Sequence, residues 1–214
     1  MQHTYSIIFG LTADPIHKGH EQAIINGVEY LRNQGFVVDR FLLIPVYFPN
    51  LIGDKQKPVA GFAHRVAMCE LVAIRLSKQL KCNISVSQIE KDIANNTGGR
   101  NYSLNTIIQL NLKNCLFMVS ADHFQGRMPK FRKWFKWQEI LAHTGLLINQ
   151  RPGHEINQGF IRELEHINPD IFIVDSMKAV DVSSTEIRAN FQYTEMAPNL
   201  SKDICRYVFI NNLY

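Results

Sequence analysis

The chain has 214 residues, of which 46% are hydrophobic and 20% charged, and its formal net charge is +4 at pH 7. This balance predicts an ordinary globular chain that can bury a full core without disulfide staples. The sequence has no signal-peptide pattern at its N-terminus, and no apolar run approaches the ~18 residues of a membrane span. The modest positive charge is weak evidence for nucleic-acid binding, which usually shows a concentrated basic stripe, and it suits an enzyme that handles anionic nucleotides.

The four cysteines are widely scattered and form no C-x-x-C pair. Cys69 and Cys115 fall within apolar runs, which predicts reduced thiols in a protein core. Reduced cysteines are typical of the cytosol, so a cytoplasmic location is expected.

Apolar runs bounded by glycine, proline or polar residues predict strands, and apolar residues at helical spacing predict helices. The expected strands cover residues 5–9, 40–45, 83–88, 115–119, 146–149 and 170–174. The expected helices cover residues 18–33, 64–78, 103–112, 134–143, 159–167, 183–191 and 202–211. Gly10 is expected to end the first strand, Gly35 to adopt a left-handed conformation after the first helix, and residues 95–101 to form a loop.

Strands that alternate with helices in this way predict right-handed βαβ units and a doubly wound parallel sheet. The expected fold is therefore α/β and Rossmann-like, with three α/β/α layers in a single domain over residues 1–214. A C-terminal helical part, residues 183–214, would pack on that domain. No G-x-G-x-x-G follows the first strand, which argues against a dinucleotide-binding dehydrogenase.

Residues 9–20 connect the first expected strand to the first expected helix with the sequence FGLTADPIHKGH. Asp14-Pro15 marks a turn, because proline disfavours the helical region for the residue before it. A strand, a tight loop and a helix start aim free backbone N–H groups and the positive end of a helix dipole at one point. His17 and His20 lie three residues apart and would share one helical face. A polyphosphate site is the favoured hypothesis; two surface histidines at a cap, or a zinc site, are the alternatives.

A second candidate phosphate site has the sequence VSSTEIR, over residues 182–188. Ser183 and Glu186 form a capping-box pattern at the start of a helix. Arg188 would lie on the same helical face as Ser184 and point back toward the open backbone N–H groups. A guanidinium beside capping hydroxyls would clamp a phosphate. The alternative is a well-capped helix start with no ligand.

These stretches resemble two motifs of the nucleotidylyltransferase superfamily, G-x-[FY]-[DN]-P-x-H-x-G-H and I-S-[ST]-T-x-[IL]-R. The sequence SAD at residues 120–122 stands where the superfamily has G-x-D. Three further segments are similar to motifs of bacterial nicotinate-mononucleotide adenylyltransferases: NYS at residues 101–103, WFKWQEIL at 134–141 and the R-P-G turn at 151–153. The resemblance covers essentially the whole chain and implies the H-x-G-H type of doubly wound fold.

The resemblance implies transfer of AMP from ATP to nicotinate mononucleotide, which gives deamido-NAD and pyrophosphate in NAD biosynthesis. The mononucleotide phosphate would attack the α-phosphorus of ATP in line, so catalysis would depend on positioning and charge stabilisation. Mg²⁺ would bridge phosphate oxygens, with few protein ligands and no dedicated metal site. The implied partners are ATP and nicotinate mononucleotide, with neither nucleic acid nor membrane, while homo-oligomerisation stays open.

The resemblance also implies individual roles. The expected catalytic residues are His17, His20 and Arg188, with His20 best placed to stabilise charge at the α-phosphate. The expected ATP-binding residues are Gly10, Thr12, His17, His20, Asp122, Ser184, Thr185 and Arg188. The expected pyridine-mononucleotide-binding residues are Asp14, Tyr102, Ser103, Trp134 and Phe135. The indole of Trp134 would stack on the pyridine ring.

Several positions depart from the family pattern. Leu11 replaces a second glycine, Ala13 replaces an aromatic residue, and the Asn50-Leu51 segment lacks the basic residue that is usual after Pro49. Two alternatives therefore stay open. One is a nucleotidylyltransferase with another acceptor, such as nicotinamide mononucleotide or phosphopantetheine, and the other is a relative that binds a nucleotide without turnover. The strongly basic residues 125–133 form either a lid over phosphates or a solvated loop.

Overall fold

A six-stranded parallel sheet forms the centre of the computed structural model, which describes residues 3–49, 57–99, 101–150, 153, 155–174, 180, 182–190 and 198–214. The strands are β1 (Thr4–Leu11), β2 (Val37–Pro45), β3 (Asn83–Val86), β4 (Cys115–Ser120), β5 (Gly145–Asn149) and β6 (Ile171–Val174). Their order is β3-β2-β1-β4-β5-β6, and all neighbouring pairs are parallel. The prediction of a doubly wound parallel sheet is confirmed, and the strand order reverses between β1 and β4.

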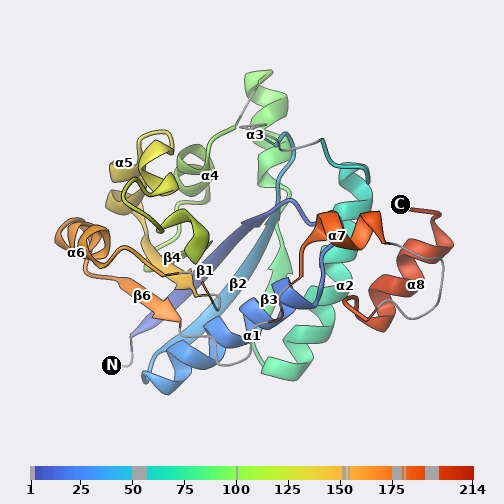
Figure 1. Cartoon of the computed structure of the whole chain (residues 1–214), viewed down its shortest axis with the longest axis horizontal. Helices are drawn as coiled ribbons and strands as arrows, with labels where there is room; N and C mark the ends of the chain where they lie inside the picture. The colour runs from blue at the N-terminus through green and yellow to red at the C-terminus, as the bar shows by residue number, and fades with distance from the viewer. Residues whose placement is uncertain are drawn as a thin grey trace.

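Helices cover both faces of this sheet (Figure 1). The α-helices are α1 (Lys18–Asn33), α2 (Phe62–Leu80), α3 (Ile89–Thr97), α4 (Ser103–Leu110), α5 (Trp137–His143), α6 (Gln158–Ile167), α7 (Ser184–Ala189) and α8 (Lys202–Ile210). Two 3-10 helices, η1 (Ala121–His123) and η2 (Lys130–Lys133), follow β4. Within the described ranges, no helix is long and apolar enough to cross a membrane.

The alternation of side chains along each strand creates two separate cores. Ile7 and Met118 face α1, α2 and α8, whereas Ile8 and Phe117 face α4, α5 and α6. Because both faces are covered, the central strands need apolar residues at successive positions, and the first five residues of β4 are all buried. All four cysteines are free and buried, in agreement with the prediction of core thiols.

Several predicted boundaries are wrong. Gly10 does not end the first strand, because Gly10 and Leu11 continue to pair with Ile44 and Pro45 of β2. The loop expected at residues 95–101 begins only after α3, a helix that ends at Gly98 with φ of +64°. The sequence of α3 buries little more than Ile93 and Ala94, so its apolar periodicity is weak. Gly35 does adopt the expected left-handed conformation, with φ of +83°.

The basic segment 125–133 is an ordered part of the fold. Phe131 is fully buried within the core that contains α5 and α6. Arg132 pairs with Glu163 of α6, with its Nη1 2.9 Å from Oε1, and its guanidinium lies 4.4 Å from the ring centroid of Phe160. Phe131 and Arg132 are therefore packed into the fold, whereas Arg127, Lys130 and Lys133 are exposed. For the exposed basic residues, the lid and the solvated loop both stay predictions. The expected helix at 134–143 begins only at Trp137, because η2 precedes it and Trp134 lies between the two.

Gly145 at the start of β5 has no room for a side chain. A Cβ there would lie 2.3 Å from the carbonyl oxygen of Asp170 and 2.8 Å from Cδ2 of Leu116. We expect Gly145→Ala to lower the free energy of unfolding by about 3 kcal/mol, because the backbone of the neighbouring strand would have to move. Urea denaturation measures the loss. Gly99→Ala is the control, because a Cβ there would meet no heavy atom nearer than 3.8 Å; equal stability of the two variants would contradict the prediction.

Candidate active site

The candidate site lies at the carboxyl ends of β1 and β4, where the strand order reverses and where ligands of such sheets bind. The loop after β1 leads into α1, and η1 directly follows β4. On one face of the sheet, the ring centroid of His20 lies 6.2 Å from that of Phe9 in β1. On the other face, Trp134 lies 5.9 Å from Phe117 in β4. The expected phosphate and pyridine residues thus flank the junction of the two central strands.

His17 and His20 build the start of α1 together. His17 is the N-cap, and its Nδ1 accepts a 3.1 Å hydrogen bond from the backbone N–H of Gly19. In return, Nδ1 of His20 accepts a 3.3 Å bond from the backbone N–H of His17, and the two ring centroids are 3.8 Å apart. The pair thus forms a capping box with histidines in place of the usual serine and glutamate. A Cβ at Gly19 would lie 3.0 Å from Nδ1 of His17, so glycine makes room for this cap.

This geometry determines which ring nitrogens can donate. Because each Nδ1 accepts a backbone hydrogen bond, the neutral form of each ring carries its proton on Nε2. The residue His17 is 2% exposed and caps the start of α1, whereas His20 is only partly buried. Gly10 near the end of β1 and Thr12 in the loop after it are also exposed. A donor on His20 therefore stands beside the positive end of the 16-residue helix α1, an arrangement that favours an anion.

The second motif docks directly onto this loop, about 170 residues away in the sequence (Figure 1). Oγ of Ser184 donates a 3.0 Å hydrogen bond to the carbonyl oxygen of Pro15. Nη1 of Arg188 donates a 2.5 Å bond to the carbonyl oxygen of Asp14, and Nη2 donates a 3.2 Å bond to Oγ1 of Thr185. The two candidate phosphate motifs are therefore parts of one site.

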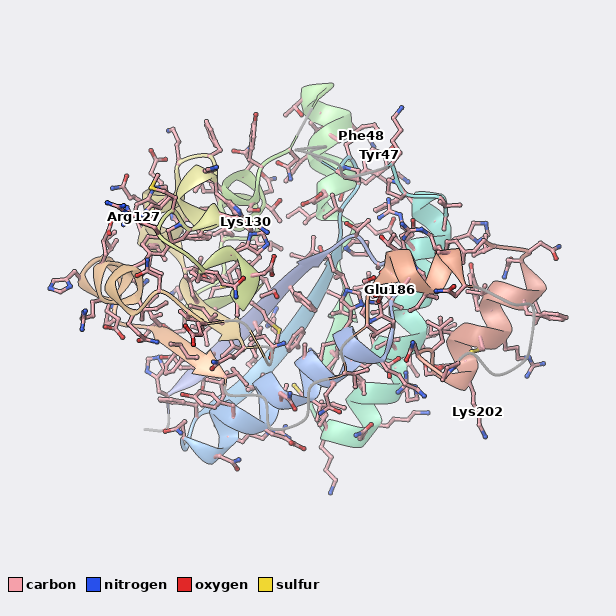
Figure 2. The ribbon with its side chains drawn as sticks, viewed as in Figure 1. Tyr47, Phe48, Arg127, Lys130, Glu186 and Lys202 are labelled. Carbon is pink, nitrogen blue, oxygen red and sulfur yellow. The ribbon has the colours of Figure 1, made fainter. Side chains whose placement is uncertain are left out.

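The predicted capping box at the start of α7 is confirmed. The Ser183 hydroxyl accepts from the backbone N–H of Glu186, and the Glu186 carboxylate accepts from that of Ser183. These hydrogen bonds hold the pKa of Glu186 below its ordinary value. Figure 2 labels Glu186 on this helix, and the next residue, Ile187, is buried in the core.

Asp14, an expected mononucleotide-binding residue, is buried in this structure. Its side chain is 2% exposed, and its carboxylate accepts hydrogen bonds from the backbone N–H groups of Val59 and Ala60 at 2.8 and 3.0 Å. It also accepts a 2.8 Å bond from the hydroxyl of Tyr214 and lies 3.5 Å from Nη1 of Arg188. In this structure Asp14 therefore binds protein groups and joins three segments of the chain.

Arg65 is a site residue that the sequence analysis missed. It is 2% exposed, and its Nη1 donates to the carbonyl oxygens of Thr12 and Val46 at 2.8 and 2.7 Å. Burial lowers the pKa of Arg65, and the negative charge of Asp14 opposes that shift. The available signal was an arginine on the apolar face of a predicted helix, where an unpaired charge would be costly.

Two clusters of aromatic side chains lie where the pyridine ring of the mononucleotide is expected, one around Tyr102 and one around Trp134. Tyr102, just before α4, stacks on Phe135 with ring centroids 4.6 Å apart, and both rings are more than a third exposed. Trp134 is partly buried and contacts Phe131 and His123 with centroid distances of 5.2 and 5.1 Å. Half-buried Ser103 begins α4.

Asp122 and the basic segment 125–133 meet beside the aromatic cluster around Trp134. The carboxylate of Asp122 in η1 lies 3.7 Å from Nζ of Lys130 and 3.8 Å from Nε2 of His123. Figure 2 shows Lys130 toward the middle of the molecule and Arg127 toward its outer edge. One basic residue of the segment thus lies at the candidate site, while Arg132 binds to α6.

Glu90 is a second residue that the sequence analysis missed, because α3 itself was missed. Its carboxylate accepts a 3.1 Å hydrogen bond from the backbone N–H of Tyr47 and a 3.5 Å bond from Oγ1 of Thr106. Burial raises the pKa of Glu90, and these two hydrogen bonds oppose the shift. Glu90 thereby ties the end of β2, where Figure 2 labels Tyr47 and Phe48, to α4.

Some predicted features lie outside the described residues, namely Asn50 and the Arg151-Pro152 part of the R-P-G turn. Gly153 of that turn is described and has φ of +77°. Among the described residues, no group of three or more His, Cys, Asp or Glu side chains is placed to hold a metal ion.

Comparisons with known proteins identify the family of this chain. The sequence model of the cytidylyltransferase-like family matches residues 8–190. A probable nicotinate-nucleotide adenylyltransferase of Thermotoga petrophila is 30% identical over 85% of this chain and 82% of its own length. A protein of the same description from Hydrogenovibrio crunogenus is 26% identical over 97% of this chain and 96% of its own length.

Solved structures with a similar fold are also known. The nicotinic acid mononucleotide adenylyltransferase of Plasmodium falciparum, complexed with NaAD, aligns with a TM-score of 0.69 and 17% identity over 99% of this chain and 98% of its own. The chain therefore belongs to the cytidylyltransferase-like family and, within it, to the nicotinate-nucleotide adenylyltransferases.

Proposed function

We propose that this chain transfers the adenylyl group of ATP to nicotinate mononucleotide, giving deamido-NAD and pyrophosphate. The phosphate oxygen of the mononucleotide attacks the α-phosphorus of ATP, and the bond from that phosphorus to the β-phosphate oxygen breaks. The incoming phosphate is itself the nucleophile, so the protein has to position two anions and stabilise the charge that develops between them.

The observation that carries the proposal is the docking of Arg188 and Ser184 onto the loop that holds His20. Two motifs far apart in sequence thereby form one cationic, donor-rich site at the switch point of the sheet. His20 would donate from Nε2 to the α-phosphate, where charge develops, and Arg188 and Thr185 would bind the leaving β- and γ-phosphates. His17 would act by holding the start of α1, because its ring is buried.

The acceptor would lie on the side of Tyr102, Ser103, Trp134 and Phe135. The exposed ring faces of Tyr102 and Phe135 are suited to contact with a flat heterocycle, and Trp134 offers a second aromatic surface. Asp122, at the end of β4, would face the adenosine portion. Mg²⁺ would arrive as part of the ATP substrate, because this ion keeps several waters and binds phosphate oxygens in preference to all-protein cages.

Pyrophosphate release tests the proposal directly. The purified chain would be assayed with ATP and Mg²⁺ against nicotinate mononucleotide, nicotinamide mononucleotide and phosphopantetheine, with deamido-NAD confirmed by mass. We expect turnover with nicotinate mononucleotide, with a higher kcat/KM than for either other acceptor. Preference for the amide would keep the mechanism and change the acceptor. Binding of ATP with no pyrophosphate from any acceptor would refute the proposed reaction.

A further inference from the structure

Tyr214, which follows α8, contacts the loop between β1 and α1. Its hydroxyl donates a 2.8 Å hydrogen bond to Oδ1 of Asp14, across 200 positions of the sequence. The ring is half-buried, and burial together with the negative charge of Asp14 raises the pKa of the phenol. The hydroxyl therefore stays protonated around neutral pH and remains a hydrogen-bond donor.

The two oxygens of the Asp14 carboxylate have different partners. Oδ1 accepts from Tyr214 and from the backbone N–H of Ala60 at 3.0 Å. Oδ2 accepts from the backbone N–H of Val59 at 2.8 Å and faces Nη1 of Arg188 at 3.5 Å. Since a carboxylate is planar and rigid, the hydrogen bonds at Oδ1 also determine where Oδ2 points. The Tyr214 hydroxyl thus helps to set the position of the negatively charged oxygen, Oδ2, that Arg188 faces.

We infer that Tyr214 is a positioning residue of the phosphate clamp: through Asp14, it holds the Arg188 guanidinium in the orientation that binds ATP phosphates. The inference rests on the proposed function for the role of Arg188. The Arg188 side chain is 18% exposed, and its guanidinium donates to the carbonyl oxygen of Asp14 and to Thr185. Asp14 therefore contacts the guanidinium through both its backbone and its side chain, while Thr185 supplies the remaining contact.

The helix that precedes Tyr214 is anchored without it. Arg75 of α2 bridges Oε1 of Glu21 in α1 and Oδ2 of Asp203 in α8, at 2.8 and 3.0 Å. The hydroxyl of Tyr207 in α8 lies 3.0 Å from Nδ1 of His64 in α2. Removing the Tyr214 hydroxyl should therefore leave α8 in place and affect only the Asp14 carboxylate.

The test compares Tyr214→Phe with Tyr207→Phe, which removes a hydroxyl from the same C-terminal part of the chain without touching Asp14. Binding of α,β-methylene-ATP with Mg²⁺ is measured by titration calorimetry, together with steady-state kinetics. We expect Tyr214→Phe to weaken binding of the analogue and to raise the KM for ATP about tenfold, because a hydrogen bond to a charged group is lost. The KM for nicotinate mononucleotide should stay at the wild-type value, and Tyr207→Phe should bind the analogue like the wild type.

A double variant tests whether the effect passes through Asp14. If it does, Tyr214→Phe added to Asp14→Asn should weaken binding of the analogue no further than Asp14→Asn alone. Equal affinities in Tyr214→Phe and Tyr207→Phe, or full additivity with Asp14→Asn, would overturn the inference. A wild type that binds the analogue without releasing pyrophosphate would refute the proposed reaction, while the binding data would still decide the role of Tyr214. A wild type that does not bind the analogue would overturn both.

Discussion

His20→Ala is expected to lower kcat by about 100- to 1,000-fold, because it removes the proposed donor to the charge that develops on the α-phosphate. The Nδ1 of His20 accepts from the backbone of His17, so Nε2 carries the proton that a phosphate oxygen would accept. The KM for nicotinate mononucleotide should change little, since the ring lies on the phosphate side of the site. Initial rates of pyrophosphate release over a range of both substrates measure the effect.

The control for this variant is His166→Ala, which removes an exposed imidazole from α6, on the other face of the sheet. It should leave kcat unchanged. The variant His20→Ala also removes the acceptor of one backbone N–H at the start of α1. A melting temperature measured with each rate separates a partly unfolded enzyme from an inactive folded one. A folded His20→Ala variant with wild-type kcat would refute the role of His20 in charge stabilisation.

Much of the fold follows from local sequence patterns. The parallel sheet is predictable because buried strands such as β4 are apolar at successive positions, while α1 has both a clear apolar face and clear ends. The helix α3 was not predictable by the same rule, since it buries mainly Ile93 and Ala94 and most of its remaining residues are polar. The start of α5 was misplaced because aromatic residues at helical spacing continue backward into η2.

The site was predictable to the extent that its motifs are contiguous. The spacing of His17, Gly19 and His20 indicated a shared helix start, and the capping pattern of Ser183 and Glu186 indicated another. The contacts between segments were beyond such patterns. No local signal shows that Arg65 binds the carbonyl oxygen of Thr12, or that Asp14 lies inside the protein, because these contacts depend on how α2 and α8 pack on the loop after β1.

The structure also shows where the two departures from the family pattern, Leu11 and Ala13, lie. Leu11 lies in β1 and is buried in the core, and Ala13 is buried with φ of +56°, a conformation that is unusual for a residue other than glycine. Neither side chain is exposed here, whereas Gly10 at the end of β1 and Thr12 in the loop are exposed. These two departures therefore alter the packing beneath the phosphate site and leave its exposed donors in place.

Arg188→Lys is the most selective test of the phosphate clamp, because it keeps the positive charge and removes the planar, forked guanidinium. Arginine reaches the carbonyl oxygen of Asp14 with one nitrogen and Oγ1 of Thr185 with another, and a single lysine ammonium cannot match that planar fork. We expect kcat/KM for ATP to fall about 100-fold, since a bidentate, charge-assisted contact to the leaving phosphates is lost.

The same exchange at an exposed position, Arg206→Lys on α8, is the matched control and should leave the kinetics unchanged. The KM for nicotinate mononucleotide should be equal in wild type and Arg188→Lys, because the proposed acceptor site lies on the side of Trp134. If kcat/KM for ATP survives in Arg188→Lys, charge alone suffices at this position, and the docking of α7 onto the loop after β1 serves the fold alone. If it falls as expected, the contact between two distant motifs is what makes the loop a site for a leaving pyrophosphate.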